Sequence, residues 1–421
     1  MTERAALVSV VTGATHQNDP ELLLEELSGL ASAAGAIVVL RAVQERSTPD
    51  PATLIGSGKA EQLARACDES NADLVIVDND LSPAQGRNLE KIIKCRVIDR
   101  TQLILDIFAR RARTREGKLQ VELAQLQYVM PRLVGSSAAL SRLGGGIGTR
   151  GPGETKLETD RRRIRERIAS LKQDIADVQR RRGHLRARRV RRDVPTVALV
   201  GYTNAGKTTL FNAMTGGEAV ASDALFVTLD PLVRKVKLPD KRQILLSDTV
   251  GFIDRLPHQL VAAFQATLEE VAGAELLLHV ADASATDRER RDAAVRSVLS
   301  EVGAAEVPSL LVFNKCDLLA SDELSRLKSM YPAAVFVSAL SGMGQSDLLE
   351  IVASRLAMDT AVVRLTFDPD SVSHRKAIAD IYRQARVLAH MVVEDRVIID
   401  ADVPRRLLER LSRLAHVEEP A

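Results

Sequence analysis

Gly201-Tyr-Thr-Asn-Ala-Gly-Lys-Thr208 is the stretch of sequence that decides the fold. An apolar run at 196–200 precedes it, and a run with helical patterning at 209–214 follows it. Glycines let backbone N–H groups curl around a phosphate, and the positive end of the following helix attracts the same anion. A strand, this turn and a helix in that order predict a P-loop within a parallel, doubly wound α/β sheet.

Two side chains of this loop have a predicted chemical role. The ammonium group of Lys207 is expected to reach the β and γ phosphates, and the hydroxyl of Thr208 is expected to bind Mg²⁺. A chance match in a glycine-rich loop is the alternative, and the flanking strand and helix argue against it. The predicted nucleotide contacts here are Gly201, Tyr202, Thr203, Asn204, Ala205, Gly206, Lys207, Thr208 and Thr209.

Two further segments suit the chemistry of a γ-phosphate. A strand-like run at 243–247 ends at Asp248, which can hold the metal through water, and Gly251 can offer its N–H group to the γ-phosphate. Between this run and the P-loop, Thr228 is expected to complete the Mg²⁺ shell only while the γ-phosphate is present; a plain surface threonine is the alternative. We predict catalytic roles for Lys207, Thr228 and Gly251, and further nucleotide contacts from Phe226, Val227, Thr228, Leu229, Asp230, Asp248, Thr249, Val250 and Gly251.

The base is predicted to be guanine. Asp317, in Asn314-Lys315-Cys316-Asp317, can accept both N–H groups of the guanine edge, whereas adenine presents the opposite polarity there and leaves the carboxylate unpaired. Ser338-Ala339-Leu340 follows another short apolar run and can place a backbone N–H group on the guanine O6. The predicted nucleotide contacts of these two motifs are Asn314, Lys315, Cys316, Asp317, Ser338, Ala339 and Leu340. The sequence therefore predicts GTP as the substrate, GDP as the product and Mg²⁺ as the cofactor.

The regions on either side differ from this sheet in pattern. Short strands and helices alternate over 1–100, the pattern turns helical over 101–193, and the part after 359 has strands, helices and a hairpin at Glu394-Asp395. We therefore expect an N-terminal α/β subdomain at 1–100, a helical hairpin at 101–193, a P-loop domain at 194–358 and a C-terminal α+β domain at 359–421.

The predicted hairpin has an apolar seam and a basic surface. Apolar residues recur at heptad spacing from Leu157 to Leu185, so this helix needs a partner helix, and the glycine-rich stretch at 144–153 is expected at the tip. A flexible linker is the alternative for that stretch. Arginines crowd the helix and can pair with phosphates as planar forks, although a solvated coiled-coil face is the alternative. The predicted RNA contacts are Arg150, Arg161, Arg162, Arg163, Arg181, Arg188 and Arg189.

Composition restricts the classes of function. Net charge is only +2, aromatic residues make up 3% and Trp is absent, so RNA contact should depend on charge and shape and not on base stacking. The three cysteines lack the spacing of a zinc site. No apolar run is long enough to span a bilayer, and 1–11 reads as a strand and not as a signal peptide. We expect a cytoplasmic protein and take it to be a monomer.

A resemblance extends over most of the chain. Arg142-Leu-Gly-Gly-Gly-Ile-Gly-Thr-Arg-Gly-Pro-Gly-Glu-Thr-Lys-Leu-Glu158, with Gln120-Val-Glu-Leu-Ala-Gln-Leu-Gln-Tyr128, Leu225-Phe-Val-Thr-Leu-Asp-Pro231 and Asp248-Thr-Val-Gly-Phe-Ile253, resembles the HflX family of ribosome-associated GTPases. That resemblance implies binding to the large (50S) ribosomal subunit and its rRNA. For some members it also implies splitting or rescue of stalled or idle 70S ribosomes, with the hairpin near the peptidyl-transferase region.

The resemblance also implies ATP use through the N-terminal domain in some members. Gly56-Ser-Gly-Lys59 opens a helix there, and we interpret it as an ordinary strand-to-helix turn with Ser57 as the helix cap; an anion site at this helix start is the alternative. His279, inside an apolar run, reads as a core histidine. Two rival functions stay open: a GTP-regulated RNA chaperone or helicase-like factor acting on free RNA, and a metabolic nucleotide enzyme, for which the sequence shows no acceptor pocket.

One position departs from many signalling GTPases. They carry glutamine directly after the glycine of the DxxG motif, where it orients the attacking water, but this chain carries Phe252, which cannot hydrogen-bond to water. We therefore expect slow hydrolysis of GTP by the protein alone and faster hydrolysis on a macromolecular surface.

Overall fold

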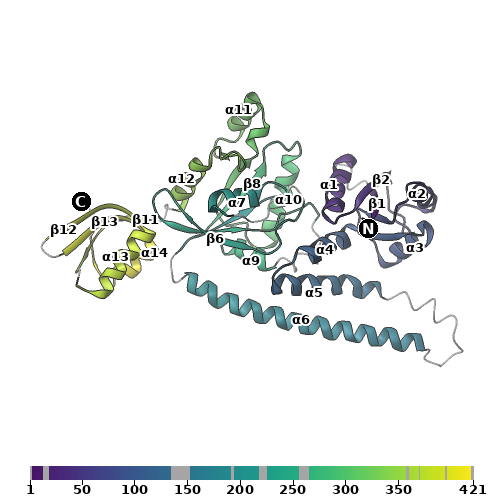
Figure 1. Ribbon diagram of the computed structural model, residues 1–421, viewed down its shortest axis with the longest axis horizontal. Coiled ribbons are helices and arrows are strands. Elements are labelled where there is room, and N and C mark those ends of the chain that lie inside the picture. Colours follow the sequence, from purple (N-terminus) through teal and green to yellow (C-terminus); the bar gives the residue numbers. More distant parts are fainter. Residues whose placement is uncertain are drawn as a thin grey trace. The chain divides into compact units, whose positions relative to one another are not determined.

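The computed structural model describes residues 2–12, 19–133, 152–190, 194–217, 225–255, 265–356, 360–368, 370–393 and 396–418. The chain forms two compact units. The first comprises Met1–Val178, Ser222–Asp230 and Leu256–Ala266, and the second comprises Gln179–Ala221, Pro231–Arg255 and Thr267–Ala421. Figure 1 shows the elements of both.

The first unit is built on a small parallel sheet. Its elements are β1 (Arg4–Val11), α1 (Pro20–Ala33), β2 (Ile37–Glu45), α2 (Ser57–Glu69), β3 (Leu74–Val77), α3 (Pro83–Ile93), β4 (Arg96–Asp99), α4 (Arg100–Arg111), α5 (Arg115–Arg132) and most of α6 (Pro152–Val190). The strand order is β2-β1-β3-β4, and helices connect successive strands because parallel neighbours need a crossover. Leu63 of α2 and Leu89 of α3 pack with Val8 and Val75 of the sheet in one core.

Polar side chains fix the starts of these helices. Ser82 and Gln85 form a capping box at α3, and Thr114 accepts a hydrogen bond from the N–H of Gly117 at α5. The helical pattern after residue 101 is broken before α5, where Ala112 and Thr114 adopt extended conformations. The prediction that Ser57 caps α2 is wrong: Gly56 occupies the N-cap with φ 73°, and no side chain makes a cap hydrogen bond there.

Helices α5 and α6 are joined by the guanidinium group of Arg167, which binds both carboxylate oxygens of Glu122 at 2.7 and 2.8 Å. In the predicted apolar seam, Leu171 and Ile175 are buried. The side chains of Leu157 and Leu185 lie outside the described residues.

The second unit contains a larger sheet with the order β10-β9-β8-β5-β7-β6, parallel except where β6 meets β7. Its core includes Leu199, Phe211, Leu246 and Leu278. The elements are β5 (Thr196–Val200), α7 (Lys207–Thr215), β6 (Leu232–Lys237), β7 (Gln243–Asp248), α9 (Gln265–Ala272), β8 (Leu276–Asp282), α10 (Arg288–Glu301), β9 (Ser309–Asn314), the 3₁₀ turn Cys316–Leu318, α11 (Ser321–Met330), β10 (Val335–Phe336) and α12 (Gln345–Leu356).

The C-terminal part of this unit has a separate antiparallel sheet with the order β12-β13-β11-β14. Its elements are β11 (Thr360–Phe367), α13 (Val372–Gln384), β12 (Arg386–Val393), β13 (Arg396–Pro404), α14 (Arg405–Leu411) and β14 (His416–Glu418). Phe367, Ile381, Ile399 and Leu407 belong to its core. Strand β14 was not expected from the sequence, because three residues carry too little pattern to identify a strand.

The expected fold class is confirmed: an N-terminal α/β part with long helices, a central P-loop sheet and a C-terminal α+β part. The exact domain boundaries stay a prediction. None of the helices in the described ranges is both long and apolar enough to cross a bilayer.

Candidate functional site

The P-loop connects β5 to α7 at the carboxyl edge of the parallel sheet, where ligands of such sheets bind. At two positions of the loop, a neighbouring atom lies so close that only glycine fits. A Cβ at Gly201 would lie 2.1 Å from the carbonyl oxygen of Val280, and a Cβ at Gly206 would lie 2.2 Å from Asn314 Nδ2. Both have positive φ, 148° and 85°, which favours glycine further. This backbone can therefore curve closely around an anion.

Lys207 is the buried cation of the loop. Its Nζ donates to the carbonyl oxygens of Gly201 at 3.0 Å and Tyr202 at 2.8 Å. Burial lowers the pKa of Lys207 to about 8, against the opposing effect of the nearby Asp248. A phosphate placed beside this group would stabilise its charged form.

Thr208 and Asp248 bring two oxygen atoms together at the end of the loop. The Thr208 hydroxyl donates to Asp248 Oδ2 at 2.8 Å, and Asp248 is fully buried at the end of β7. Hydroxyl and carboxylate oxygens are the ligands that Mg²⁺ prefers, and this ion usually takes only one or two protein ligands beside phosphate and water. The pair therefore fits the predicted magnesium site. The described part of the chain contains no cluster of three or more His, Cys, Asp or Glu that could hold a metal.

The segment after Asp248 lies against the P-loop through its backbone. The N–H of Phe252 donates to Gly201 at 3.0 Å, and its carbonyl oxygen accepts from Thr203 at 2.7 Å. A Cβ at Gly251 would lie 2.8 Å from Thr203 Cα and 3.0 Å from Lys207 Nζ. The Phe252 side chain is buried, so no polar group stands where signalling GTPases carry glutamine.

Asn314 joins the phosphate motif to the predicted base motifs. Its Nδ2 donates to the carbonyl oxygen of Ala205, and its Oδ1 accepts from the N–H of Ala339, both at 2.9 Å. The N–H group of Ala339, which the sequence offered to a guanine O6, therefore donates to Asn314 in this structure. Ser338 is buried, and the Leu340 side chain is 84% exposed.

Asp317 is exposed in the turn Cys316–Leu318. In the part of the chain that the structure describes, its carboxylate has no hydrogen-bonding or ionic partner. Such a carboxylate can accept both N–H groups of a guanine edge.

The predicted segment at 225–230 belongs to the first unit, whereas the P-loop belongs to the second. The Asp230 carboxylate accepts hydrogen bonds from the backbone N–H groups of Arg113 at 3.0 Å and Thr114 at 2.9 Å, and from the Thr114 hydroxyl. Phe226 is buried, and its ring meets Phe108 edge-on at 4.8 Å. The role of Thr228 beside the metal stays a prediction.

Six of the seven predicted RNA contacts lie on α6. Arg162 and Arg163 have side chains that are 72% and 74% exposed, with loose ion pairs to Glu166 at 3.8 Å and Asp160 at 4.0 Å. Arg161 is half-buried. Arg150 and the side chains of Arg181, Arg188 and Arg189 lie outside the described residues.

Sequence reasoning missed two partners of these motifs. Asp282, the last residue of β8, pairs with Lys315, and the Tyr202 hydroxyl accepts from the N–H of Asp254 at 3.0 Å. The position of Asp282 at the carboxyl end of a strand beside the base motif was a usable signal. Nothing in the local sequence indicated the bond between Tyr202 and Asp254.

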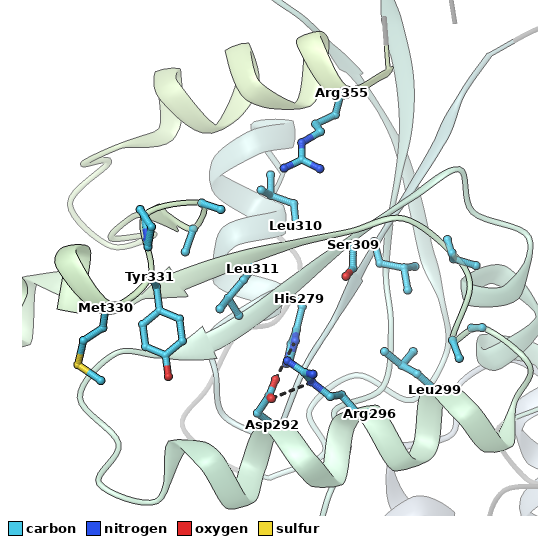
Figure 2. A pocket seen from close by; sticks show the side chains of 17 residues that line it. His279, Asp292, Arg296, Leu299, Ser309, Leu310, Leu311, Met330, Tyr331 and Arg355 are labelled. Carbon is cyan, nitrogen blue, oxygen red and sulfur yellow. Dashed lines mark ion pairs between the residues drawn. The ribbon is translucent and has the colours of Figure 1, made fainter. Parts of the chain in front are cut away.

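A separate cavity of about 600 Å³ lies in the second unit, and none of the predicted nucleotide contacts lines it. Figure 2 shows His279, Asp292 and Arg296 pointing toward one another there. Asp292 lies 3.4 Å from His279 Nδ1 and 2.8 Å from Arg296 Nε. Burial lowers the pKa of His279 below its usual value, in spite of Asp292. His279 is therefore a buried histidine with a partner, as expected.

Three family models match consecutive parts of the chain: GTP-binding GTPase N-terminal at residues 21–109, GTP-binding GTPase Middle Region at 111–189 and 50S ribosome-binding GTPase at 196–315. The GTPase HflX of Caldanaerobacter subterraneus is 45% identical over 409 residues, which is 97% of this chain and 93% of that protein. The chain belongs to the HflX family of GTPases. The HflX of Escherichia coli K12 is 48% identical over 369 residues, 87% of this chain and 86% of its own.

The resemblance to this family inferred from the sequence is thereby confirmed, and the chain is a GTPase. Among solved structures, a GTP-binding protein from the archaeon Sulfolobus solfataricus in complex with GDP is similar. It is 25% identical with a TM-score of 0.43, over 84% of this chain and 98% of that one.

Proposed function

We propose that this HflX-family GTPase binds GTP with Mg²⁺ at the P-loop, engages the large ribosomal subunit and its rRNA while GTP is bound, and separates stalled or idle 70S ribosomes under stress. Hydrolysis to GDP then permits release. It would act as a monomer in the cytoplasm. The observation that carries the nucleotide part is the Asn314 side chain, which ties Ala205 of the phosphate loop to Ala339 of the base motif. The ribosomal part is supported by the match to the 50S ribosome-binding GTPase model.

Each motif has a proposed task. P-loop N–H groups and Lys207 hold the phosphates, Gly251 offers its N–H to the γ-phosphate, and Asp317 accepts the N–H groups of guanine. Thr208, and Asp248 through water, would hold Mg²⁺, with Thr228 joining while the γ-phosphate is present. The ion supplies positive charge to the β and γ phosphate oxygens.

Slow hydrolysis by the isolated protein follows from Phe252, because its buried apolar side chain cannot orient water. We propose that the ribosome supplies or rearranges the missing group. Phosphate release should therefore accelerate sharply when 50S subunits are added. Equal rates with and without ribosomes would contradict this step.

The central experiment is sedimentation of 70S ribosomes with the protein and GTP, a non-hydrolysable analogue or GDP. We expect binding to 50S subunits and loss of the 70S peak with GTP or the analogue, and neither with GDP. The ribosomal proposal fails if 70S particles stay intact and unbound in all three states.

The exposed arginines of α6 favour a second candidate, a GTP-regulated chaperone of free RNA. Reversing the charge of Arg162 and Arg163 to Glu should weaken 50S binding and reduce its salt dependence by about one unit of slope per lost phosphate contact. Arg326→Glu with Lys328→Glu, the same charge change on the exposed helix α11, is the matched control. Tight binding to naked RNA together with no binding to 50S would favour the chaperone.

The proposal extends to weak ATP use by the N-terminal domain. Gly56 is the N-cap of α2, and no side chain caps the N–H groups of the first helical turn. A Cβ at Gly56 would lie 2.3 Å from the Arg46 guanidinium group. A helix N-terminus beside a cation suits a phosphate. If calorimetry detects no ATP binding in the presence of saturating GDP, the proposed ATP use is contradicted and the proposed GTPase function is not affected.

A further inference from the structure

Asp282 lies directly beside the base motif. It is the last residue of β8 and is in register with Asn314, the last residue of β9. Its carboxylate receives the Lys315 ammonium group at 2.8 Å, and its side chain is only 11% exposed. The same carboxylate accepts from the N–H and the hydroxyl of Ser284 at 2.9 and 2.6 Å. The ion pair is therefore built into the fold at the edge of the sheet.

Several charged hydrogen bonds hold Asp282 in its ionised form. Burial by itself would raise its pKa, but the hydrogen bonds from Lys315 and Ser284 outweigh burial and keep the pKa below the usual value. Ionised at neutral pH, Asp282 is a permanent partner for the Lys315 ammonium group.

The backbone places Lys315 directly before the turn that carries Asp317. Its φ of 62° lies in the left-handed region, which is unfavourable for a lysine by about 1 kcal/mol. The turn Cys316–Leu318 starts immediately after it, so Asp317 is two residues away. A lysine side chain is long and flexible enough to reach a carboxylate at that separation. Asp317 is thus the carboxylate nearest to Lys315 in the sequence.

The carboxylates of Asp282 and Asp317 differ in burial and in bonding. Asp282 is buried and bound to Lys315, whereas Asp317 is exposed and, among the described residues, has no hydrogen bond or ion pair. A carboxylate that already held an ammonium group would offer a guanine edge fewer free lone pairs and less negative charge.

We propose that Asp282 is a positioning residue for base recognition: it keeps the Lys315 ammonium group away from Asp317, so that the Asp317 carboxylate stays available to guanine. This inference rests on the proposed reading of guanine by Asp317. Asp282 need not touch the nucleotide, and its effect passes through Lys315.

The test compares GDP with inosine diphosphate, which lacks the amino group whose N–H would donate a hydrogen bond to Asp317. A hydrogen bond to a charged group contributes enough to predict at least about a tenfold preference of the wild-type protein for GDP. In Asp282→Asn, the GDP dissociation constant should rise about tenfold and the preference over inosine diphosphate should fall to about threefold or less. Ser284→Ala, which removes a bond to the same carboxylate without changing Lys315, should keep the preference.

A double-mutant cycle separates this mechanism from loss of local structure. With Lys315→Met the competing ammonium group is absent, so adding Asp282→Asn should change GDP affinity less than twofold. An equal loss in both backgrounds, or an unchanged preference in Asp282→Asn, overturns the inference. If the wild-type protein itself binds both nucleotides equally, the reading of guanine by Asp317 fails instead.

Discussion

Asp230 adds a polar attachment to the segment that carries Thr228, beside the buried Phe226, and one isosteric change can weaken this attachment. The carboxylate accepts two backbone N–H groups, from Arg113 and Thr114, at the start of α5. Unpaired N–H groups and the helix dipole both favour a negative charge at that position. Asp230→Asn keeps the shape of the side chain and removes the charge.

The magnitude follows from the type of bond. Hydrogen bonds to a charged group contribute about 1.5–3 kcal/mol, and the half-exposed position of Asp230 places the loss at about 1.5 kcal/mol. This corresponds to about a tenfold increase in the population in which the segment at 225–230 is detached.

Gly117→Ala tests the same contact from the other side. A Cβ on Gly117 would lie 2.5 Å from Asp230 Oδ1 and 3.2 Å from the Thr114 hydroxyl oxygen, so the carboxylate must move although Asp230 is unchanged. Gly86→Ala in α3 is the matched control, because a Cβ there meets nothing within 4 Å. That control should be more stable by about 0.5–1 kcal/mol, as usual for alanine in a helix.

Hydrogen exchange in the nucleotide-free protein measures the attachment. Backbone amides at 225–230 and the first turn of α5 should exchange about tenfold faster in Asp230→Asn and Gly117→Ala, and at the wild-type rate in Gly86→Ala. If both test variants retain wild-type exchange in these peptides, the carboxylate does not hold the segment and the reasoning is refuted.

Three further predictions concern the site and the first unit. Gly251→Ala places a Cβ 2.8 Å from Thr203 Cα, so phosphate release should fall about a hundredfold with GDP affinity nearly unchanged; a wild-type rate would contradict this. Chelation of Mg²⁺ should reduce GTP hydrolysis by more than about a hundredfold, and persistent turnover in EDTA would exclude the magnesium site. Arg100→Met removes the guanidinium group that pairs with the buried Asp78 and with Glu26, so urea denaturation should show a loss of about 3–5 kcal/mol; a loss below about 1 kcal/mol would show that these pairs contribute little.

The fold class could be predicted because its signals are local. The strand at 196–200, the glycine-rich turn and the following helix are adjacent in sequence, and the carboxyl ends of parallel strands meet at one edge. That rule also explains why Asn314, at the end of β9, lies within hydrogen-bond distance of Ala205 and Ala339.

Other features have no local signal. The break between α4 and α5 falls in a charged stretch at 110–116, where only the threonine at the N-cap of α5 marks a new helix start. Gly56 and not Ser57 occupies the N-cap of α2. Both residue types are common at N-caps, so the sequence alone could not choose between them. The contact between Asp230 and Thr114 joins residues 116 positions apart, and neither periodicity nor spacing can reveal such a pair.

Helix α5 lies between the segment at 225–230 and other parts of the first unit. Its 18 residues span about 27 Å at 1.5 Å per residue. At its start it holds Asp230; in its middle Glu122 binds Arg167 of α6; near its end the Tyr128 hydroxyl donates to the buried Asp99 at 2.8 Å.

The two ends of α5 are held very differently. Asp99 also binds Arg132 at 2.9 Å, and burial raises the pKa of Tyr128, so the hydroxyl stays a donor at any physiological pH. The far end is therefore anchored to β4 by buried polar bonds, whereas the first turn depends on a half-exposed carboxylate from a distant segment. Between these ends, the Glu122–Arg167 pair is partly exposed, and ion pairs of this kind contribute little to stability. We therefore expect loss of the Asp230 contact to increase hydrogen exchange in the first turn of α5, while exchange near Tyr128 stays at the wild-type rate.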